Sequence, residues 1–165
     1  MKNKLKISII TVTKNSEKFL QETIDSLSRQ TYQNFEHIVV DGASTDHTLD
    51  IIKKNSYQIK KWVSEPDDGL YYAINKGIKF CSGDVIGILN SDDVYFPDAL
   101  KIVNKYFLEN QIDFLFGSVF KHKLMHGFYP KKIKWTFGFY TTHSIGFFIK
   151  KSSQDKIGFY NTKYK

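Results

Sequence analysis

The chain has 165 residues, of which 41% are hydrophobic and 16% aromatic, a size and composition that suit one globular domain with a buried core. A single cysteine, Cys81, excludes an internal disulfide, and we expect it to be a structural thiol in a reducing, cytoplasmic compartment. The sequence lacks a run of about 18 apolar residues, so it predicts no membrane-spanning helix.

The net charge of +7 is concentrated in the C-terminal part of the chain. Residues 1–100 carry 12 Lys and Arg against 14 Asp and Glu, whereas residues 101–165 carry 12 Lys against 3 acids. A basic surface fits an anionic membrane, a nucleic acid or a phosphate-bearing substrate. Because Arg29 is the one arginine, and base readout favours the paired hydrogen bonds of arginine, the sequence disfavours a nucleic acid as partner.

Hydrophobic periodicity divides residues 7–119 into strands that alternate with helices. In chain order the pattern predicts strand 7–13, a helix over 19–27 capped by Ser16, strand 36–41, helix 46–54, strand 59–64, helix 70–80, strand 85–89, helix 97–109 and strand 113–119. This order predicts an α/β fold, with a mixed, mainly parallel sheet and helices on both faces. Residues 120–165 show no clean period.

Polar side chains follow each of the first four predicted strands. They are Thr11, Thr13 and Asn15 at the first, Asp41, Ser44 and Asp46 at the second, Glu65, Asp67 and Asp68 at the third, and Asn90, Asp92 and Asp93 at the fourth. Loop polarity explains each group separately, but an open α/β sheet binds its ligand at the carboxyl ends of its strands. We therefore expect a binding site at this edge. The glycine-rich signatures of a Rossmann dinucleotide site and of a P-loop are missing.

Asp92 and Asp93 are adjacent acids that follow the apolar strand 85–89. Adjacent carboxylates repel each other unless a cation or solvent lies between them, and hard divalent ions such as Mg²⁺ bind carboxylate oxygens together with substrate phosphates. Asn, Ser and Asp also favour turns, so an Asx-rich turn before the next helix explains the same residues equally well. The two interpretations stay open at this point.

Four segments together resemble family 2 glycosyltransferases of the GT-A fold. They are residues 7–15, residues 39–48 (VVDGASTDHT), residues 64–77 (SEPDDGLYYAINKG) and residues 90–93 (NSDD) with Pro97. The third is similar to the variant found in polysaccharide and lipopolysaccharide assembly enzymes. The motifs fall in the family's order at compatible spacings, and the resemblance covers most of residues 5–150.

The resemblance implies inverting transfer of a sugar from a nucleotide diphosphate sugar to a saccharide or lipid-linked acceptor in surface polysaccharide synthesis. It also implies that Mg²⁺ or Mn²⁺ holds the diphosphate. Residue by residue, it assigns Thr11, Thr13 and Asn15 to the nucleotide, Asp41 to a hydrogen bond from the base, Asp68, Asn75 and Lys76 to the donor, Asp93 to the metal, Asp92 to the metal and the donor sugar or ribose, and His143 to the acceptor side. Asn90 stands where the commoner pattern has its first acid. A hydrogen-bonded core imidazole explains His143 equally well.

Inverting transfer also needs a base that takes the proton of the acceptor hydroxyl. In the family this base is a carboxylate in a motif that follows the stretch resembled by residues 158–161, and the sequence reaches only Lys165. We therefore expect residues 1–165 to form a single GT-A domain truncated before the base motif. The alternative is a non-catalytic sugar-nucleotide binding module. A nucleotidyltransferase is disfavoured because the first strand lacks a glycine-rich phosphate loop.

Residues 128–151 form a basic, aromatic segment, with five lysines among Phe, Tyr and Trp residues. Such a segment favours anionic lipid surfaces, where aromatic side chains lie at headgroup depth. We expect it to hold the protein peripherally at the cytoplasmic face of a membrane, near a lipid-linked acceptor. Core aromatics with solvated lysines are the other explanation.

Overall fold

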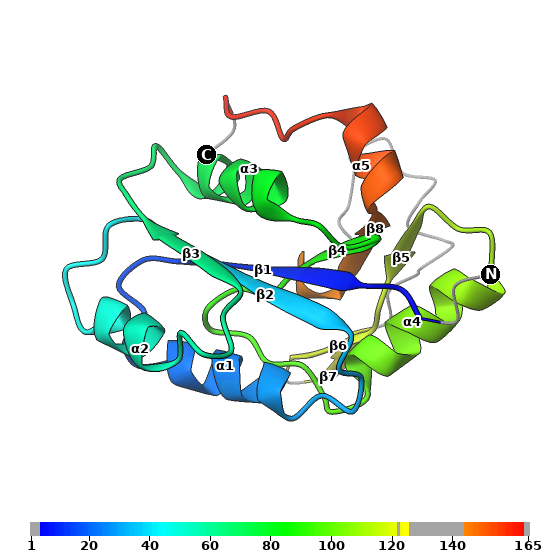
Figure 1. The fold of residues 1–165 in the computed structure, drawn as a ribbon, viewed down its shortest axis with the longest axis horizontal. Helices are drawn as coiled ribbons and strands as arrows, with labels where there is room; N and C mark the ends of the chain where they lie inside the picture. The colour runs from blue at the N-terminus through cyan, green and yellow to red at the C-terminus, as the bar shows by residue number, and fades with distance from the viewer. Residues whose placement is uncertain (1–3, 122, 126–143, 164–165) are drawn as a thin grey trace.

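A six-stranded sheet with helices on both faces forms the body of the protein (Figure 1). The computed structural model describes residues 4–121, 123–125 and 144–163. The strands are β1 (Ile7–Thr13), β2 (Phe35–Asp41), β3 (Lys61–Ser64), β4 (Val85–Ile88), β5 (Phe114–Phe116), β6 (Val119–Lys121), β7 (Lys123–Met125) and β8 (Phe147–Lys150). The helices are α1 (Leu20–Ser28), α2 (Thr48–Lys54), α3 (Leu70–Phe80), α4 (Ala99–Glu109) and α5 (Lys151–Ile157), with a 3₁₀ turn η1 (Ser144–Gly146).

The sheet has the strand order β3-β2-β1-β4-β8-β5. Strands β1 to β4 pair in parallel, and β8 runs antiparallel to both of its neighbours. Helices α1, α2 and α4 cover one face, and α3 and α5 cover the other (Figure 1). The predicted fold class, a mixed and mainly parallel sheet with helices on both faces, is confirmed.

The alternating pattern of the sequence located the elements up to α4, and α2 and β3 begin two residues later than predicted. Three further differences have a structural explanation. The predicted cap Ser16 is wrong: α1 begins at Leu20, and the Ser16 hydroxyl lies 2.8 Å from the Ser91 hydroxyl instead. Helix α4 begins two residues after Pro97, because the Pro97 carbonyl accepts a hydrogen bond from the backbone of Thr31 at 2.8 Å. The predicted strand 113–119 is divided into β5 and β6.

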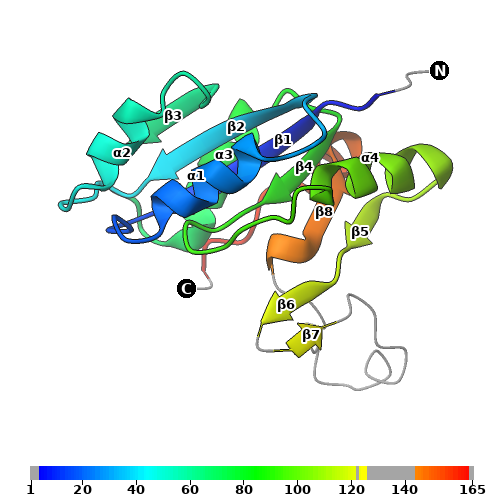
Figure 2. The same ribbon diagram turned by 90° about the horizontal axis from the view of Figure 1, so that it is seen from below.

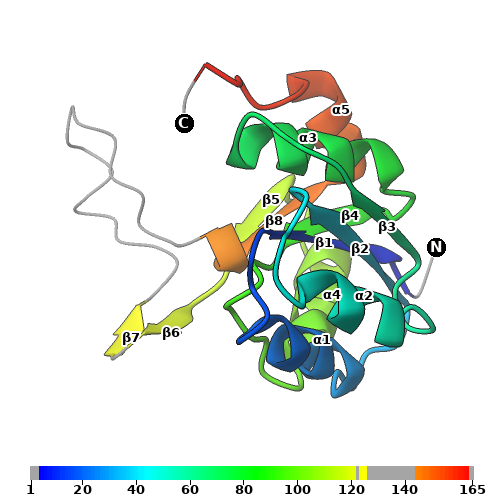
Figure 3. The same ribbon diagram turned by 90° about the vertical axis from the view of Figure 1, so that its left-hand side faces the viewer.

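Strands β6 and β7 form a small antiparallel hairpin that projects from the body of the molecule (Figures 2 and 3). The chain returns to the main sheet through η1 and β8. Residues 128–143 of the basic segment 128–151 lie outside the described residues, so the membrane contact of this segment stays a prediction. Within the described ranges, the helices are too short or too polar to cross a bilayer.

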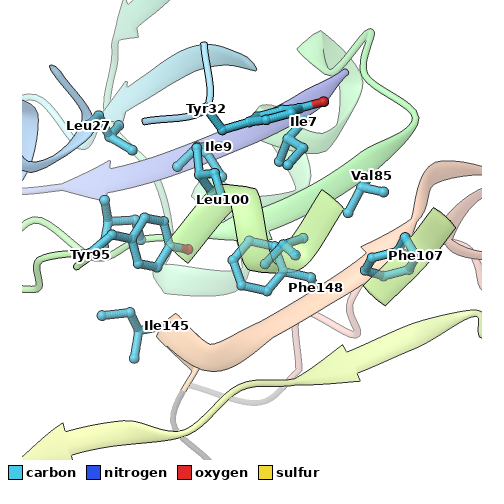
Figure 4. Packing of buried hydrophobic residues seen from close by; sticks show 12 residues of the cluster. Ile7, Ile9, Leu27, Tyr32, Val85, Tyr95, Leu100, Phe107, Ile145 and Phe148 are labelled. Atoms are coloured by element: carbon cyan, nitrogen blue, oxygen red, sulfur yellow. The ribbon is translucent and has the colours of Figure 1, made fainter. Parts of the chain in front are cut away.

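The two faces of the sheet carry separate cores, because successive residues of a strand point to opposite faces. Residues Ile7 and Ile9 of β1 pack with α1 and α4, in a cluster that includes Tyr95, Leu100 and Phe148 (Figure 4). The intervening Ile10 and Val12 pack against α3. Helix α3 lies so close to β1 that a Cβ atom at Gly77 would be 2.4 Å from the Ile10 side chain. This packing fixes the carboxyl ends of the parallel strands.

Cys81, at the C-terminal end of α3, is a buried thiol. It donates a hydrogen bond of 3.3 Å to the Gly77 carbonyl, and burial raises its pKa to about 12. A thiol with a raised pKa is a poor nucleophile, because the thiolate is the reactive form. The structural role expected for Cys81 agrees with this environment.

Candidate functional site

The carboxyl ends of β1, β2 and β3 meet in register at one edge of the sheet. Thr13 pairs with Asp41, and Asp41 pairs with Ser64, so three side chains from three strands lie next to one another. Strand β4 ends before β1 does, because its last residue, Ile88, pairs with Ile10, and β1 continues to Thr13. The loop that follows β4 therefore approaches the same edge, as the sequence predicts.

Asp41 is the centre of a hydrogen-bond network inside this edge. It is fully buried, and its carboxylate accepts hydrogen bonds from the Ser44 amide at 3.0 Å, from the Ser44 hydroxyl, and from the Ser64 hydroxyl at 2.6 Å. The Ser44 hydroxyl in turn accepts a hydrogen bond from the backbone N–H of Asn15 at 2.8 Å. Asp41 thus joins the loops that follow β1 and β2 to the last residue of β3. Asp41 has no exposed surface, and its assigned hydrogen bond to the base stays a prediction.

Two threonines on the same face of β1 have different surroundings. Thr11 is fully buried, and its hydroxyl lies 2.9 Å from Nε2 of the buried His37, whose pKa burial lowers to about 3. The Thr11 hydroxyl therefore has a partner inside the protein, and its assignment to the nucleotide stays a prediction. Thr13 is 6% exposed, and its Oγ1 has no hydrogen-bond partner within the described part of the chain.

The backbone of this edge adopts left-handed conformations at two non-glycine residues. Asn15 has φ 51° and Ala43 has φ 57°. Such conformations persist where the surroundings fix them, and they are concentrated at ligand sites. Asn15 is held by its own side chain, which accepts a hydrogen bond from the Thr45 amide at 2.9 Å. A Cβ atom at Gly42 would lie 2.9 Å from Asp67, so the loops after β2 and β3 are in close contact.

Residues Asn90 to Asp93 form a tight turn after β4. The Asp93 amide donates to the Asn90 carbonyl at 3.1 Å, and the Asn90 side chain donates to the Asp93 carboxylate at 2.9 Å. Thr23 of α1 donates to the Asp93 carbonyl at 2.9 Å. Asp92 is exposed, whereas Asp93 is half-buried. The turn therefore fixes one carboxylate and leaves its neighbour in solvent.

The Asn90–Asp93 turn is tied to the edge formed by β1 and β2. The hydroxyls of Ser16 and Ser91 lie 2.8 Å apart and join the loop after β1 to the loop after β4. Among the described residues, no group of three or more His, Cys, Asp and Glu side chains could hold a metal ion. Asp92 and Asp93 are adjacent acids in this turn, and their role as metal ligands stays a prediction.

The predicted residues on and before α3 are placed differently from one another. Asp68 is exposed at the edge. The Lys76 ammonium lies 2.9 Å from the Glu65 carboxylate. The Asn75 side chain bonds both the amide and the carbonyl of Tyr160 at 2.9 Å, and the Tyr160 ring stacks on Tyr71 with ring centres 5.5 Å apart. Asn75 therefore fastens the segment after α5 to α3. His143 lies outside the described residues.

Sequence reasoning missed three contributors to the edge. Ser64 belongs to strand β3, and only the register of β3 with β2 reveals that it meets Asp41. The contact of Ser16 with Ser91 joins residues 75 positions apart. Gly42 carries a detectable signal, because a glycine directly after a strand often marks a close approach of backbone and side chain.

Comparisons with known proteins identify the family. The model of glycosyl transferase family 2 matches residues 8–162. The chain is 33% identical over 113 residues to WfgD of Escherichia coli, a UDP-Glc:alpha-D-GlcNAc-diphosphoundecaprenol beta-1,3-glucosyltransferase, and this match covers 68% of the chain and 45% of WfgD.

Two solved structures share the fold. S. aureus TarS 1-349 in complex with UDP aligns with a TM-score of 0.79 at 25% identity, over 97% of this chain and 51% of that one. The mannosyltransferase PcManGT from Pyrobaculum calidifontis, in complex with GDP-Man and Mn²⁺, aligns with a TM-score of 0.77 at 18% identity, over 96% of this chain and 48% of that one. The expected GT-A fold is confirmed, and the chain spans about half the length of these proteins. Since the family model matches most of its residues, the chain belongs to glycosyl transferase family 2.

Proposed function

We propose that this chain is the donor-binding part of an inverting glycosyltransferase that moves a sugar from a nucleotide diphosphate sugar to a saccharide or lipid-linked acceptor in polysaccharide synthesis. Membership of the family supports sugar transfer. The name of WfgD, a glucosyltransferase with a UDP-sugar donor and a diphosphoundecaprenol-linked acceptor, supports both substrate classes. The UDP complex of TarS supports a nucleotide diphosphate as the ligand, and ligands of open α/β sheets bind at the carboxyl edge.

The observation that carries the proposal is the hydroxyl of Thr13. Its Oγ1 is buried and has no partner within the described part of the chain. An unpaired buried hydroxyl costs on the order of 1–3 kcal/mol, so it is retained where a ligand can satisfy it. Thr13 is next to Asp41 in the sheet and two residues before the left-handed Asn15. We infer that the nucleoside part of the donor hydrogen-bonds Thr13 and lies against the loop of Asn15.

The acids of the Asn90–Asp93 turn fit a divalent cation such as Mg²⁺ or Mn²⁺. Their carboxylate oxygens are hard ligands, and Mg²⁺ is commonly bound through one or two carboxylates plus substrate phosphates. A bound divalent cation supplies positive charge that offsets the donor diphosphate. Asn90 holds the Asp93 carboxylate in place, and the PcManGT complex with Mn²⁺ supports a metal in this fold. Asp92 remains free to turn toward the metal, the donor sugar or the ribose.

Calorimetric titration of the chain with UDP, in Mn²⁺ or in chelator, tests this assignment. We expect UDP to bind only when the divalent ion is present, because adjacent carboxylates otherwise repel the diphosphate. The variant Asp93→Ala should weaken UDP binding in Mn²⁺ on the order of tenfold or more, roughly 1.4 kcal/mol. In chelator the variant and the wild type should behave alike.

The matched control is Asp155→Ala, which removes an exposed acid on α5 that is paired with Lys151 at 2.9 Å. This variant should bind UDP as the wild type does. Equal UDP affinity with and without the divalent ion would exclude the metal role of Asp92 and Asp93. A wild-type chain that binds no UDP under either condition would overturn the proposed function itself.

A further inference from the structure

A cavity of about 640 Å³ lies at the amino end of the parallel strands, opposite to the edge that we assign to the donor. Its walls come from the C-terminal half of α1, the start of β2 and the segment between α2 and β3. Helix α1 covers this face of the sheet (Figure 1). The volume is within the range of about 300–1,000 Å³ that is typical of small-molecule sites. The donor-edge residues Thr13, Asp41 and Asp93 do not line this cavity.

The inner wall of the cavity combines aliphatic side chains with one imidazole. Ile24 and Leu27 of α1 and Ile59 before β3 are buried and line it. His37 of β2 is 2% exposed, and burial lowers its pKa to about 3, so the imidazole is neutral at pH 7. An apolar ligand body therefore finds aliphatic contacts on this wall, next to a single uncharged polar ring.

The side chain of His37 points toward α1. Val39, two residues later on β2, packs against Ile24 of α1, and residues two apart in a strand share a face. The Nε2 atom of His37 lies 2.9 Å from the Thr11 hydroxyl. The other ring nitrogen, Nδ1, has no hydrogen-bond partner among the described residues. Because a neutral imidazole has one donor and one acceptor nitrogen, and buried polar groups are rarely left unpaired, Nδ1 is available to a ligand.

The rim of the cavity carries one uncompensated positive charge. The Lys6 ammonium lies 2.6 Å from the Glu36 carboxylate, so these two charges offset each other. Lys60 is exposed and has no ion-pair partner among the described residues. Its backbone N–H donates to the His37 carbonyl at 2.9 Å, so Lys60 is directly beside the imidazole residue. The other rim residues are uncharged at pH 7: Ser28, Gln33, Tyr57 and Gln58.

We propose that this cavity is a second ligand site, which binds a small organic monoanion with an apolar body. The body lies against the three aliphatic side chains, a polar group at its inner end hydrogen-bonds Nδ1 of His37, and its carboxylate lies near Lys60. An uncharged ligand leaves the Lys60 charge without a partner, and a polyanion places further negative charge next to Glu36. The proposal does not depend on the donor function, because it uses none of the donor-edge residues.

Calorimetric titration of the full chain tests the site with three matched phenols. They are the anion 4-hydroxyphenylacetate, the neutral 4-hydroxyphenylacetamide and the cation tyramine. We expect the carboxylate to bind about three- to fivefold more tightly than the amide, because it pairs with an exposed lysine, and tyramine to bind most weakly. Phenylacetate lacks the hydroxyl group and should bind about three- to tenfold more weakly than 4-hydroxyphenylacetate, because His37 then keeps an unpaired nitrogen.

The variant Lys60→Gln removes the uncompensated charge and should abolish the preference for the carboxylate over the amide. The matched control is Lys61→Gln, which removes the same charge from the next residue. The Lys61 ammonium lies 3.7 Å from the centre of the Phe80 ring, and Lys61 does not line the cavity, so this variant should keep the preference. Amide NMR shifts should place the carboxylate at residues 57–60, and saturating UDP with Mn²⁺ should leave its affinity unchanged.

Equal affinities for the carboxylate and the amide, or a preference that Lys60→Gln retains, would overturn the proposal. Competition with UDP, or amide shifts concentrated in the Asn90–Asp93 turn, would place the anion at the donor edge and overturn it too. The same holds if the wild-type chain does not bind the carboxylate at millimolar concentration. A chain that binds the carboxylate at residues 57–60 but binds no UDP would support this site and remove only the proposed donor function.

Discussion

Strand β2 carries a buried carboxylate near each of its ends, and the two acids have different kinds of partner. Near the amino end, Glu36 lies 2.6 Å from the Lys6 ammonium and accepts hydrogen bonds from Ser8 at 2.6 Å and from the Ser82 amide at 2.7 Å. At the carboxyl end, Asp41 accepts hydrogen bonds from Ser44 and Ser64, and no cation is paired with it among the described residues. Burial alone therefore does not distinguish a structural acid from a site acid.

What distinguishes the two acids is the kind of group that each one holds. Glu36 joins β1, β2 and the segment after α3, all of which are parts of the core. The network around Asp41 fixes loops, and it adjoins an unpaired hydroxyl at Thr13. Glu36 thus completes its interactions within the protein, whereas we propose that the network of Asp41 supports a ligand site.

The largest expected effect on stability is that of Glu36→Gln. Burial by itself raises the pKa of Glu36, but Lys6, Ser8 and Ser82 outweigh it and lower the pKa from 4.5 to about 2. A carboxyl with a lowered folded-state pKa stabilises the protein above its unfolded pKa, and this stabilisation is lost as the pH falls toward 2. We expect urea unfolding at pH 7 to show a loss of about 2–3 kcal/mol.

The difference between wild type and Glu36→Gln should shrink as the pH falls from 5 to 2.5, while UDP affinity at pH 7 stays unchanged. A stability difference that is constant over this range would exclude the ion pair as its source. A loss of UDP affinity would remove the contrast with Asp41, since Glu36 would then also serve the site.

A smaller loss of stability, with a clear loss of binding, is expected for Asp41→Asn. The amide offers one acceptor oxygen in place of two. Ser44 donates to both oxygens of Asp41, so it loses an acceptor in either orientation of the amide, and in one orientation Ser64 loses its acceptor too. We expect the free energy of unfolding to fall by about 1–2 kcal/mol and UDP affinity to fall about tenfold, because the Ser44–Asn15 contact loosens. Thermal melting and UDP calorimetry on the same samples separate the two effects. The control Ser64→Ala removes one donor to Asp41 and leaves Ser44 in place, so it should bind UDP more tightly than Asp41→Asn.

The sequence predicted most of the fold because local periodicity determines where strands and helices form. The bounds of β1 and α3 agree with the prediction, since each has a continuous apolar face. The cap of α1 was wrong because the hydroxyl of Ser16 is engaged by a residue of another loop. The division of the predicted strand 113–119 reflects pairing of β5 with β8, a strand some 30 residues later in the chain. Partners so distant in the chain produce no signal in the sequence around Ser16 or β5.

The position of the candidate site was predictable from the sequence, but the contacts of each residue in it were not. Strand ends of a parallel sheet meet at one edge, so Thr13, Asp41 and Asp93 could be grouped from their places in the sequence. Whether a side chain there faces a ligand depends on its neighbours in space. Asn75 carries an amide suited to a ligand, yet it bonds the backbone of Tyr160.

The finest test of the comparison uses two threonines of one strand. Thr11 and Thr13 lie two residues apart on the same face of β1, but the hydroxyl of Thr11 meets His37 and that of Thr13 has no partner in the described chain. Replacing Thr11 by valine leaves a buried imidazole nitrogen unpaired, so the free energy of unfolding should fall by about 1–2 kcal/mol with UDP affinity unchanged. Thr13→Val removes an unsatisfied group, so stability should stay level or rise by about 1 kcal/mol.

The same Thr13→Val variant should bind UDP about 3- to 10-fold more weakly, because one hydrogen bond to the donor contributes roughly 0.5–1.5 kcal/mol. Opposite changes in stability and affinity are the signature of a hydroxyl that is kept for a ligand, and a residue needed only for packing would not produce them. Urea unfolding and UDP calorimetry in Mn²⁺ measure the two quantities. If Thr13→Val binds UDP as the wild type does, the unpaired hydroxyl is not a donor contact, and the network around Asp41 loses its strongest link to the nucleotide.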